Sequence, residues 1–184
     1  VDRRFGSIDD FVALLEAGWT VLAPNIRGST GYGRAYAALD DGDRRVDTFA
    51  DIARLARWLA ALDGVDADRL ALMGQSYGGF MTLAGLARDP SRWRCGVDLY
   101  GMADLATFLA ETAAYRRSHR AAEYGAPTAD AAALAALSPL ARAGAIEAPV
   151  FIAHGLDDPR VRPAESRRIA SALSDEARQS DVVA

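Results

Sequence analysis

Cysteine, histidine and long hydrophobic runs are all scarce in this sequence. Cys95 is the single cysteine in 184 residues, so no intrachain disulfide can form, and its apolar neighbours favour a buried thiol over a nucleophile. No apolar stretch approaches the roughly 18 residues that a transmembrane helix requires. The net charge of −4, without a long basic stripe, argues against nucleic acid as a partner. We therefore expect neither a membrane protein, nor a disulfide scaffold, nor a nucleic-acid-binding protein.

The composition that is present suits one globular domain. The length is that of about one domain, 51% of the residues are hydrophobic and 25% are charged. We find no internal repeat and no linker, so we predict a single domain over residues 1–184. The chain begins at Val1 without an initiating methionine or a signal peptide, and we therefore expect it to be part of a longer protein.

Short apolar runs alternate with segments of helical period along the chain. The predicted strands are residues 19–23, 69–74, 94–100 and 149–153, with one more expected to start near residue 181. The predicted helices are residues 9–17, 48–62, 78–87 and 163–173, with two or three more between residues 103 and 145. This alternation is typical of βαβ units. It predicts an α/β fold, with a mostly parallel sheet and helices on both faces.

The strongest local motif is residues 74–78, which read GQSYG and match the pattern G-x-S-x-G. A predicted strand precedes it and a predicted helix follows, which is the context that this motif requires. In the α/β-hydrolase fold such a turn raises a nucleophilic serine, here Ser76, above the strand ends. The glycines avoid side-chain collisions, and the N–H of Tyr77 points at the developing oxyanion. The alternative interpretation is a structural glycine turn.

A serine nucleophile needs a histidine base and a carboxylate that orients it. In α/β-hydrolases the chain order is serine, acid, histidine, and residues 154–161 follow the fourth long strand with two candidate acids, Asp157 and Asp158. Loops at the carboxyl ends of parallel strands meet at one edge of the sheet, which would bring such an acid to Ser76. The alternative is a turn or helix-capping aspartate.

The histidine is missing from its expected place. The two histidines of the chain, His119 and His154, both precede the candidate acid, so their order is wrong for this fold. We predict that both have structural roles, and that the catalytic histidine lies beyond residue 184.

Three ordered motifs together resemble the catalytic domain of the prolyl oligopeptidase family, in its acylaminoacyl peptidase and dipeptidyl aminopeptidase branch. These are residues 25–33 (NIRGSTGYG), 74–81 (GQSYGGFM) and 154–161 (HGLDDPRV). The resemblance implies that Asp158 rather than Asp157 is the catalytic acid. It also implies that Arg160 holds a substrate carbonyl, while Val161 and Tyr77 line the pocket for the residue before the scissile bond.

The same resemblance implies parts that these 184 residues do not contain. They are an upstream β-propeller, an upstream loop that supplies a second oxyanion donor, and the downstream histidine. We therefore expect a fold that is incomplete at both termini and inactive by itself. The single cysteine and the resemblance favour a cytoplasmic enzyme, and a homo-oligomer of the parent is an open alternative to a monomer. The implied substrate is a short peptide, and no cofactor or metal is implied.

Two other functions fit the same residues. A carboxylesterase for small acyl esters would have the same serine turn at residues 74–78 and the same acid, and comparing ester with peptide substrates would distinguish it. A non-catalytic α/β-hydrolase-like binding module would lack the histidine naturally, and a reading frame that ends at Ala184 would support it.

Overall fold

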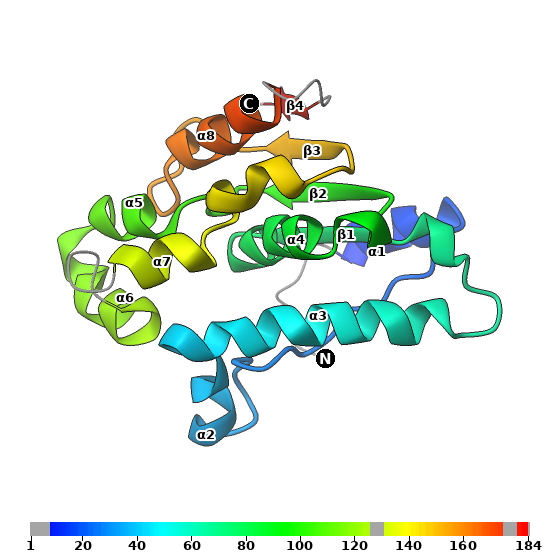
Figure 1. Cartoon of the computed structure of the whole chain (residues 1–184), viewed down its shortest axis with the longest axis horizontal. Coiled ribbons are helices and arrows are strands. Elements are labelled where there is room, and N and C mark those ends of the chain that lie inside the picture. The colour runs from blue at the N-terminus through cyan, green and yellow to red at the C-terminus, as the bar shows by residue number, and fades with distance from the viewer. Residues whose placement is uncertain (1–7, 126–130, 175–179, 184) are drawn as a thin grey trace.

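The computed structural model describes residues 8–125, 131–174 and 180–183 (Figure 1). Within these residues four parallel strands form one sheet in the order β1-β2-β3-β4. Their bounds are β1 (Ala71–Gln75), β2 (Cys95–Leu99), β3 (Val150–Ala153) and β4 (Ser180–Val183). The predicted α/β class with a parallel sheet is confirmed. Because the strands run in one direction, their carboxyl ends share one edge of the sheet.

The helices follow the predicted periodicity closely. They are α1 (Ile8–Glu16), α2 (Arg34–Ala37), α3 (Arg45–Ala60), α4 (Tyr77–Arg88), α5 (Leu105–Ala110), α6 (Arg117–Tyr124), α7 (Ala131–Leu137) and α8 (Pro163–Ser174). Short 3-10 turns include η1 (Ala38–Asp40), η2 (Gly42–Arg44) and η6 (Pro139–Ala145). The stretch between residues 103 and 145, predicted as two or three helices, contains α5, α6 and α7.

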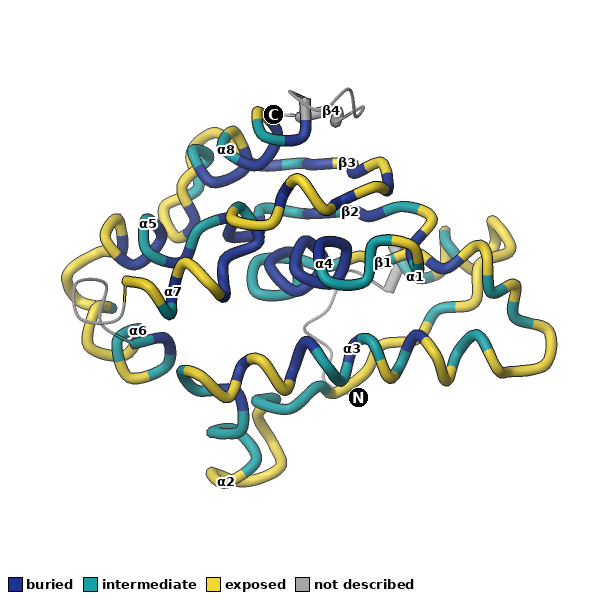
Figure 2. Tube along the Cα trace, in the orientation of Figure 1, coloured by how far each residue is buried: buried dark blue, intermediate teal, exposed yellow. Residues whose placement is uncertain are grey.

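Helix α4 lies at the centre of the core, against β1 and β2, with α3 and η6 packed on it (Figures 1 and 2). Its residues from Gly79 to Ala87 are all buried, and Phe80, Leu83 and Leu86 have no exposed surface. A helix that is apolar on every side belongs in an interior. Each large side chain buried there contributes about 2 kcal/mol to folding. The helix that follows the predicted nucleophile is therefore firmly anchored.

The two faces of the sheet differ in how far neighbouring elements shield them from solvent. Alternate residues of β3, such as Val150 and Ile152, face α8 and are 3% and 0% exposed. Met73 and Phe151 lie in one row on the opposite face, since both pair with Val97, and they are 49% and 43% exposed.

The prediction of a strand at residues 19–23 is wrong for the described structure. The segment has an extended, irregular backbone, and Trp19 and Leu22 are 42% and 41% exposed. A strand needs a hydrogen-bonded neighbour, and no described segment forms a ladder with this one. Strong β-propensity alone does not supply that partner.

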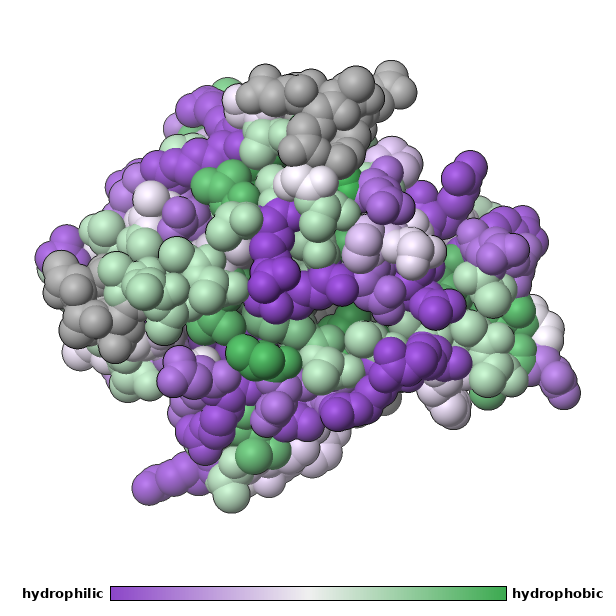
Figure 3. Space-filling view, in the orientation of Figure 1, coloured by the Kyte–Doolittle hydropathy of each residue, from purple (hydrophilic) through white to green (hydrophobic). Residues whose placement is uncertain are grey.

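The surface shows several small apolar patches separated by hydrophilic side chains on the face drawn in Figure 3. Among the described residues, no helix has the length and apolar character needed to cross a bilayer.

Candidate active site

Ser76 forms the whole connection between β1, which ends at Gln75, and α4, which begins at Tyr77. Its φ of 52° and ψ of −112° lie where residues other than glycine are rarely found. Such backbone strain persists only where the surroundings enforce it, and it is common at active sites. The N–H of Ser76 donates to the carbonyl of Leu99 on β2 at 2.9 Å, which ties the turn to the sheet.

The glycines of the motif have different reasons to be glycine. A Cβ on Gly74 would lie 2.2 Å from the carbonyl carbon of Gly78, so the strand and the helix approach too closely for a side chain there. A Cβ on Gly79 would lie 2.2 Å from Oδ1 of Asp98. Nothing lies within 4 Å of the position of a Cβ on Gly78. The prediction that a side chain would collide is confirmed at Gly74 and is wrong at Gly78. The backbone of Gly78 is what a side chain on Gly74 would collide with.

Tyr77 is the first residue of α4, so its backbone N–H has no acceptor within the helix. That N–H adjoins Ser76, where a donor would stabilise an oxyanion. The side chain points elsewhere: its hydroxyl donates to Oδ2 of Asp40 at 2.8 Å and accepts from Nε of Arg45 at 3.1 Å. Burial raises the pKa of Tyr77, so the phenol stays neutral. The oxyanion role of Tyr77 stays a prediction.

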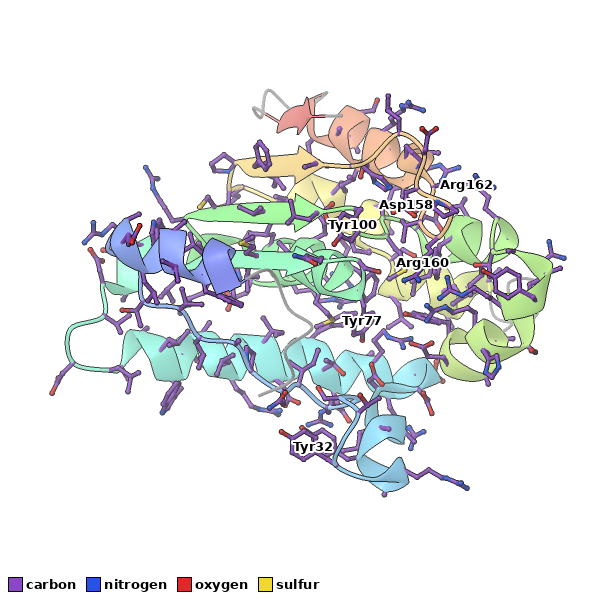
Figure 4. The ribbon with its side chains drawn as sticks, turned by 180° about the vertical axis from the view of Figure 1, so that it is seen from behind. Tyr32, Tyr77, Tyr100, Asp158, Arg160 and Arg162 are labelled. Carbon is purple, nitrogen blue, oxygen red and sulfur yellow. The ribbon has the colours of Figure 1, made fainter. Side chains whose placement is uncertain are left out.

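Asp158 lies in the loop between β3 and α8, at the carboxyl edge of the sheet and beside Tyr100 (Figure 4). Its Oδ1 accepts hydrogen bonds from the N–H groups of Arg160 at 2.7 Å and Val161 at 3.1 Å. This side chain therefore holds its own loop in a turn. Asp157 is exposed.

Ser76 and Asp158 follow strands that are separated by β2. The N–H of Tyr100, just after β2, donates to the carbonyl of Ala153 at 2.8 Å, in the same row as the bond from Ser76 to Leu99. Two strand spacings amount to roughly 10 Å. The elements that carry the predicted nucleophile and acid therefore end at one edge, far enough apart for an imidazole to lie between them.

Tyr100 was not singled out from the sequence. Its φ is 48°, and its hydroxyl donates to Oε1 of Gln75 at 2.7 Å. Burial and the nearby charge of Asp158 raise its pKa. The signal in the sequence that could have identified Tyr100 is an aromatic residue directly after an apolar strand, but such residues usually belong to the hydrophobic core.

Neither histidine is hydrogen bonded to the Ser76 hydroxyl in the described structure. The ring of His154 is buried, with Nδ1 2.6 Å from Oγ of Ser166 and Nε2 2.9 Å from the carbonyl oxygen of Val161. His119 is exposed on α6. His154 therefore has partners for both nitrogens, which agrees with the predicted structural role.

The sequence profile of the prolyl oligopeptidase family matches residues 7–184. The chain belongs to the prolyl oligopeptidase family. This confirms the predicted resemblance, and at the level of the family it confirms the class of serine-type peptidase.

Named relatives agree with this membership. The chain is 37% identical over 165 residues to dipeptidyl aminopeptidase BIII of Pseudoxanthomonas mexicana, covering 87% of this chain and 24% of the relative. The structure is similar to an acylaminoacyl peptidase of Pyrococcus horikoshii, with a TM-score of 0.79, 25% identity and coverage of 86% and 26%. It is also similar to a puromycin-hydrolysing peptidase of Mycobacterium tuberculosis, with a TM-score of 0.74, 31% identity and coverage of 86% and 24%. The chain thus spans about a quarter of the length of these proteins.

The segment 25–33, one of the three motifs that predicted the prolyl oligopeptidase family, has clear contacts. Nη2 of Arg27 donates to Oδ1 of Asp51 at 3.0 Å, which ties the segment to α3. Gly28 has a φ of 90°, and a Cβ there would lie 2.2 Å from Oδ1 of Asp40. The glycine is required because a carboxylate occupies the space of its side chain.

Two of the three predicted substrate-binding residues, Arg160 and Val161, lie on the loop between β3 and α8 that carries Asp158, which we call the acid loop, whereas the third, Tyr77, is the first residue of α4. The side chain of Arg160 is exposed at the carboxyl edge of the sheet (Figure 4). Val161 is only 3% exposed and belongs to the hydrophobic core. The binding roles of Arg160, Val161 and Tyr77 stay predictions. Within the described residues, no group of three or more His, Cys, Asp or Glu side chains could hold a metal ion.

Proposed function

We propose that this chain is the catalytic region of a serine peptidase in which Ser76 is the nucleophile and Asp158 orients the histidine base. The observation that carries the proposal is the strained Ser76 turn, next to the N–H of Tyr77, which has no acceptor within α4. The position of Asp158 on a loop at the same edge of the sheet supports it. Membership of the prolyl oligopeptidase family supports a peptide as the substrate.

The reaction follows from these groups. Oγ of Ser76 forms a bond to the peptide carbonyl carbon while its proton moves to the histidine, and the N–H of Tyr77 stabilises the oxyanion. The C–N bond then breaks, and the departing amine takes the proton from the histidine. Water, deprotonated by the same histidine, releases the acyl group and restores Ser76. Neither His119 nor His154 is hydrogen bonded to Ser76 in the described structure, so we propose a histidine outside these 184 residues.

The finer features of the proposal concern the intact protein. The names of two relatives, a dipeptidyl aminopeptidase and an acylaminoacyl peptidase, support short peptides as substrates. An upstream β-propeller, homo-oligomers and a cytoplasmic location remain predictions. The single cysteine suits a reducing compartment.

The test is fluorophosphonate labelling of the full-length protein and of residues 1–184, read by intact mass, with Ser76→Ala as the control. We expect labelling and peptide hydrolysis of the full-length protein, both abolished by the substitution, and no labelling of the folded 184-residue chain. Labelling that persists in Ser76→Ala would refute the nucleophile. Labelling of residues 1–184 that depends on Ser76 would refute the proposal of an outside histidine. Hydrolysis of esters but not of peptides would indicate a carboxylesterase.

A further inference from the structure

A buried polar cluster surrounds the side chain of Tyr77. Arg45, the first residue of α3, has no exposed surface. Its guanidinium carbon lies 4.1 Å from the ring centroid of Tyr124 and 5.4 Å from that of Tyr77. Its Nε donates to the Tyr77 hydroxyl at 3.1 Å. Tyr77 lies between the strand ends and this end of α3 (Figure 4).

Asp40 completes the cluster from the other side. Its Oδ2 accepts the hydrogen bond of the Tyr77 hydroxyl at 2.8 Å and lies 3.8 Å from Nη2 of Arg45. Asp40 is 7% exposed, and its carboxylate packs on the bare backbone of Gly28. The cluster thus links segment 25–33 to the residue that follows Ser76.

The charges of the cluster depend on one another. Burial by itself would lower the pKa of Arg45, but Tyr77, Tyr124 and Asp40 more than offset it, so the pKa is raised and the guanidinium stays charged. Neither Nη atom of Arg45 has a hydrogen-bond acceptor in the described structure. Its position therefore depends on the Tyr77 hydroxyl, the two aromatic rings and the charge of Asp40.

The phenol of Tyr77 is fixed at both ends. Its hydroxyl uses its proton for Asp40 and a lone pair for Arg45, so its direction is set. Its ring stacks on Phe80, with centroids 5.6 Å apart and planes 24° apart. The ring and the backbone N–H of Tyr77 share one Cα, so an anchored ring limits the rotation of that N–H.

We propose that Asp40 and Arg45 are positioning residues that, through the side chain of Tyr77, hold its backbone N–H towards the oxyanion beside Ser76. The inference rests on the proposed peptidase function. Removal of a complete oxyanion donor lowers kcat by about 10²–10³. A donor that remains but is poorly aligned should lose part of that effect, about tenfold in kcat, with little change in KM because the contact forms only in the transition state.

Adjacent residues offer matched controls. Arg44 and Asp41 form an ion pair of the same length, 3.8 Å between Nη2 and Oδ2, but Arg44 is exposed and neither residue is bonded to Tyr77. Asp40→Asn and Arg45→Met would therefore be compared with Asp41→Asn and Arg44→Met. Tyr77→Phe removes one oxygen and keeps the ring, so it tests the anchor even where an Arg45 variant fails to fold.

The experiment measures kcat and KM for a peptide in the full-length protein, per site titrated with fluorophosphonate, together with the Ki of a peptide aldehyde. We expect Asp40→Asn, Arg45→Met and Tyr77→Phe each to lower kcat about tenfold, to raise the aldehyde Ki by a similar factor and to leave KM within twofold. The control variants should match the wild type. Combining Asp40→Asn with Tyr77→Phe should cost no more than either substitution alone.

Two outcomes would overturn the inference. One is an unchanged kcat per titrated site in Asp40→Asn and Tyr77→Phe. The other is an equal loss in the Asp41 and Arg44 controls. A purely structural role would lower the number of titrated sites and leave kcat per site and the aldehyde Ki unchanged. Activity that survives Ser76→Ala would instead reject the proposed function, so the two failures are distinguishable.

Discussion

The Ser76 turn and the Asp158 loop meet at one edge of the sheet, but they are held in different ways. The turn is a single residue between β1 and α4, and backbone contacts at Gly74 and Gly79 fix it from below. The acid loop is longer and more exposed. It depends on polar contacts of side chains: Asp158 accepts a hydrogen bond from the N–H of Arg160, and the His154 ring contacts the carbonyl oxygen of Val161. Steric exclusion positions the first region, whereas polar contacts position the second.

The carboxyl groups of the two regions, Asp98 near the turn and Asp158 in the acid loop, also differ in burial and in hydrogen bonding. Asp98 on β2 lies beneath the turn with no exposed surface; Oδ1 accepts from the N–H of Gly101 at 2.9 Å, and Oδ2 has no partner in the described structure. Asp158 is only half-buried, and backbone N–H groups satisfy its carboxylate. Substitutions in the two regions should therefore have unequal effects, and the following predictions go from the largest to the smallest.

The largest expected effect is a pH dependence of stability caused by Asp98. Burial raises its pKa from 3.8 to about 7, although the bond from Gly101 opposes the shift. The folded state therefore holds a proton that the unfolded chain releases above pH 3.8. This contribution to stability is complete below that pH and is lost as the pH rises to about 7, by up to about 4 kcal/mol.

Urea denaturation at pH 5 and pH 7 would measure roughly half of this effect, about 2 kcal/mol. Asp98→Asn, of the same shape but without the titration, should remove most of the difference between the two pH values. A wild-type protein as stable at pH 7 as at pH 5 would contradict the prediction.

The steric difference between the two regions can be tested with two alanines. Gly74→Ala should destabilise the protein by about 3 kcal/mol, because its Cβ would collide with the backbone of Gly78. Gly155→Ala in the acid loop has nothing within 4 Å of its Cβ and should change stability by less than about 0.5 kcal/mol. Denaturation midpoints would show this, and similar losses in both variants would remove the distinction.

The polar support of the acid loop should have a smaller effect. His154→Ala leaves the buried Ser166 hydroxyl and the Val161 carbonyl without their partner, at a cost of about 2 kcal/mol. His119→Ala, at an exposed position, is the control and should be nearly neutral. Thermal unfolding would measure both. Equal melting temperatures for the two variants would mean that His154 does not support the loop.

Much of this molecule was predictable because its signals are local. Helical periodicity gave α3, α4 and α8 within a few residues, and the G-x-S-x-G spacing located the turn at Ser76. The strand predicted at residues 19–23 failed because a strand depends on a neighbour, which lies outside any local pattern.

Contacts between residues far apart in the sequence could not be predicted from local sequence patterns. Asp40 and Arg45 lie in a charged stretch that resembles a solvated surface, yet they meet Tyr77 more than 30 residues later. Asp98 offered one clue, a charge inside an otherwise apolar strand, but its position under Gly79 depends on how α4 packs on β2. The buried Glu165 likewise accepts hydrogen bonds from the N–H groups of Ala103 and Asp104.

The sequence by itself determined the α/β class, the Ser76 turn and the family resemblance, because periodicity, glycine spacing and the alternation of strands with helices can be read along the chain. Only the tertiary structure decided which buried charges have partners. It placed Tyr77 between Asp40 and Arg45, and among the described residues it left one oxygen of Asp98 without a hydrogen-bond partner. Burial and electrostatics depend on distances between elements, and packing sets those distances.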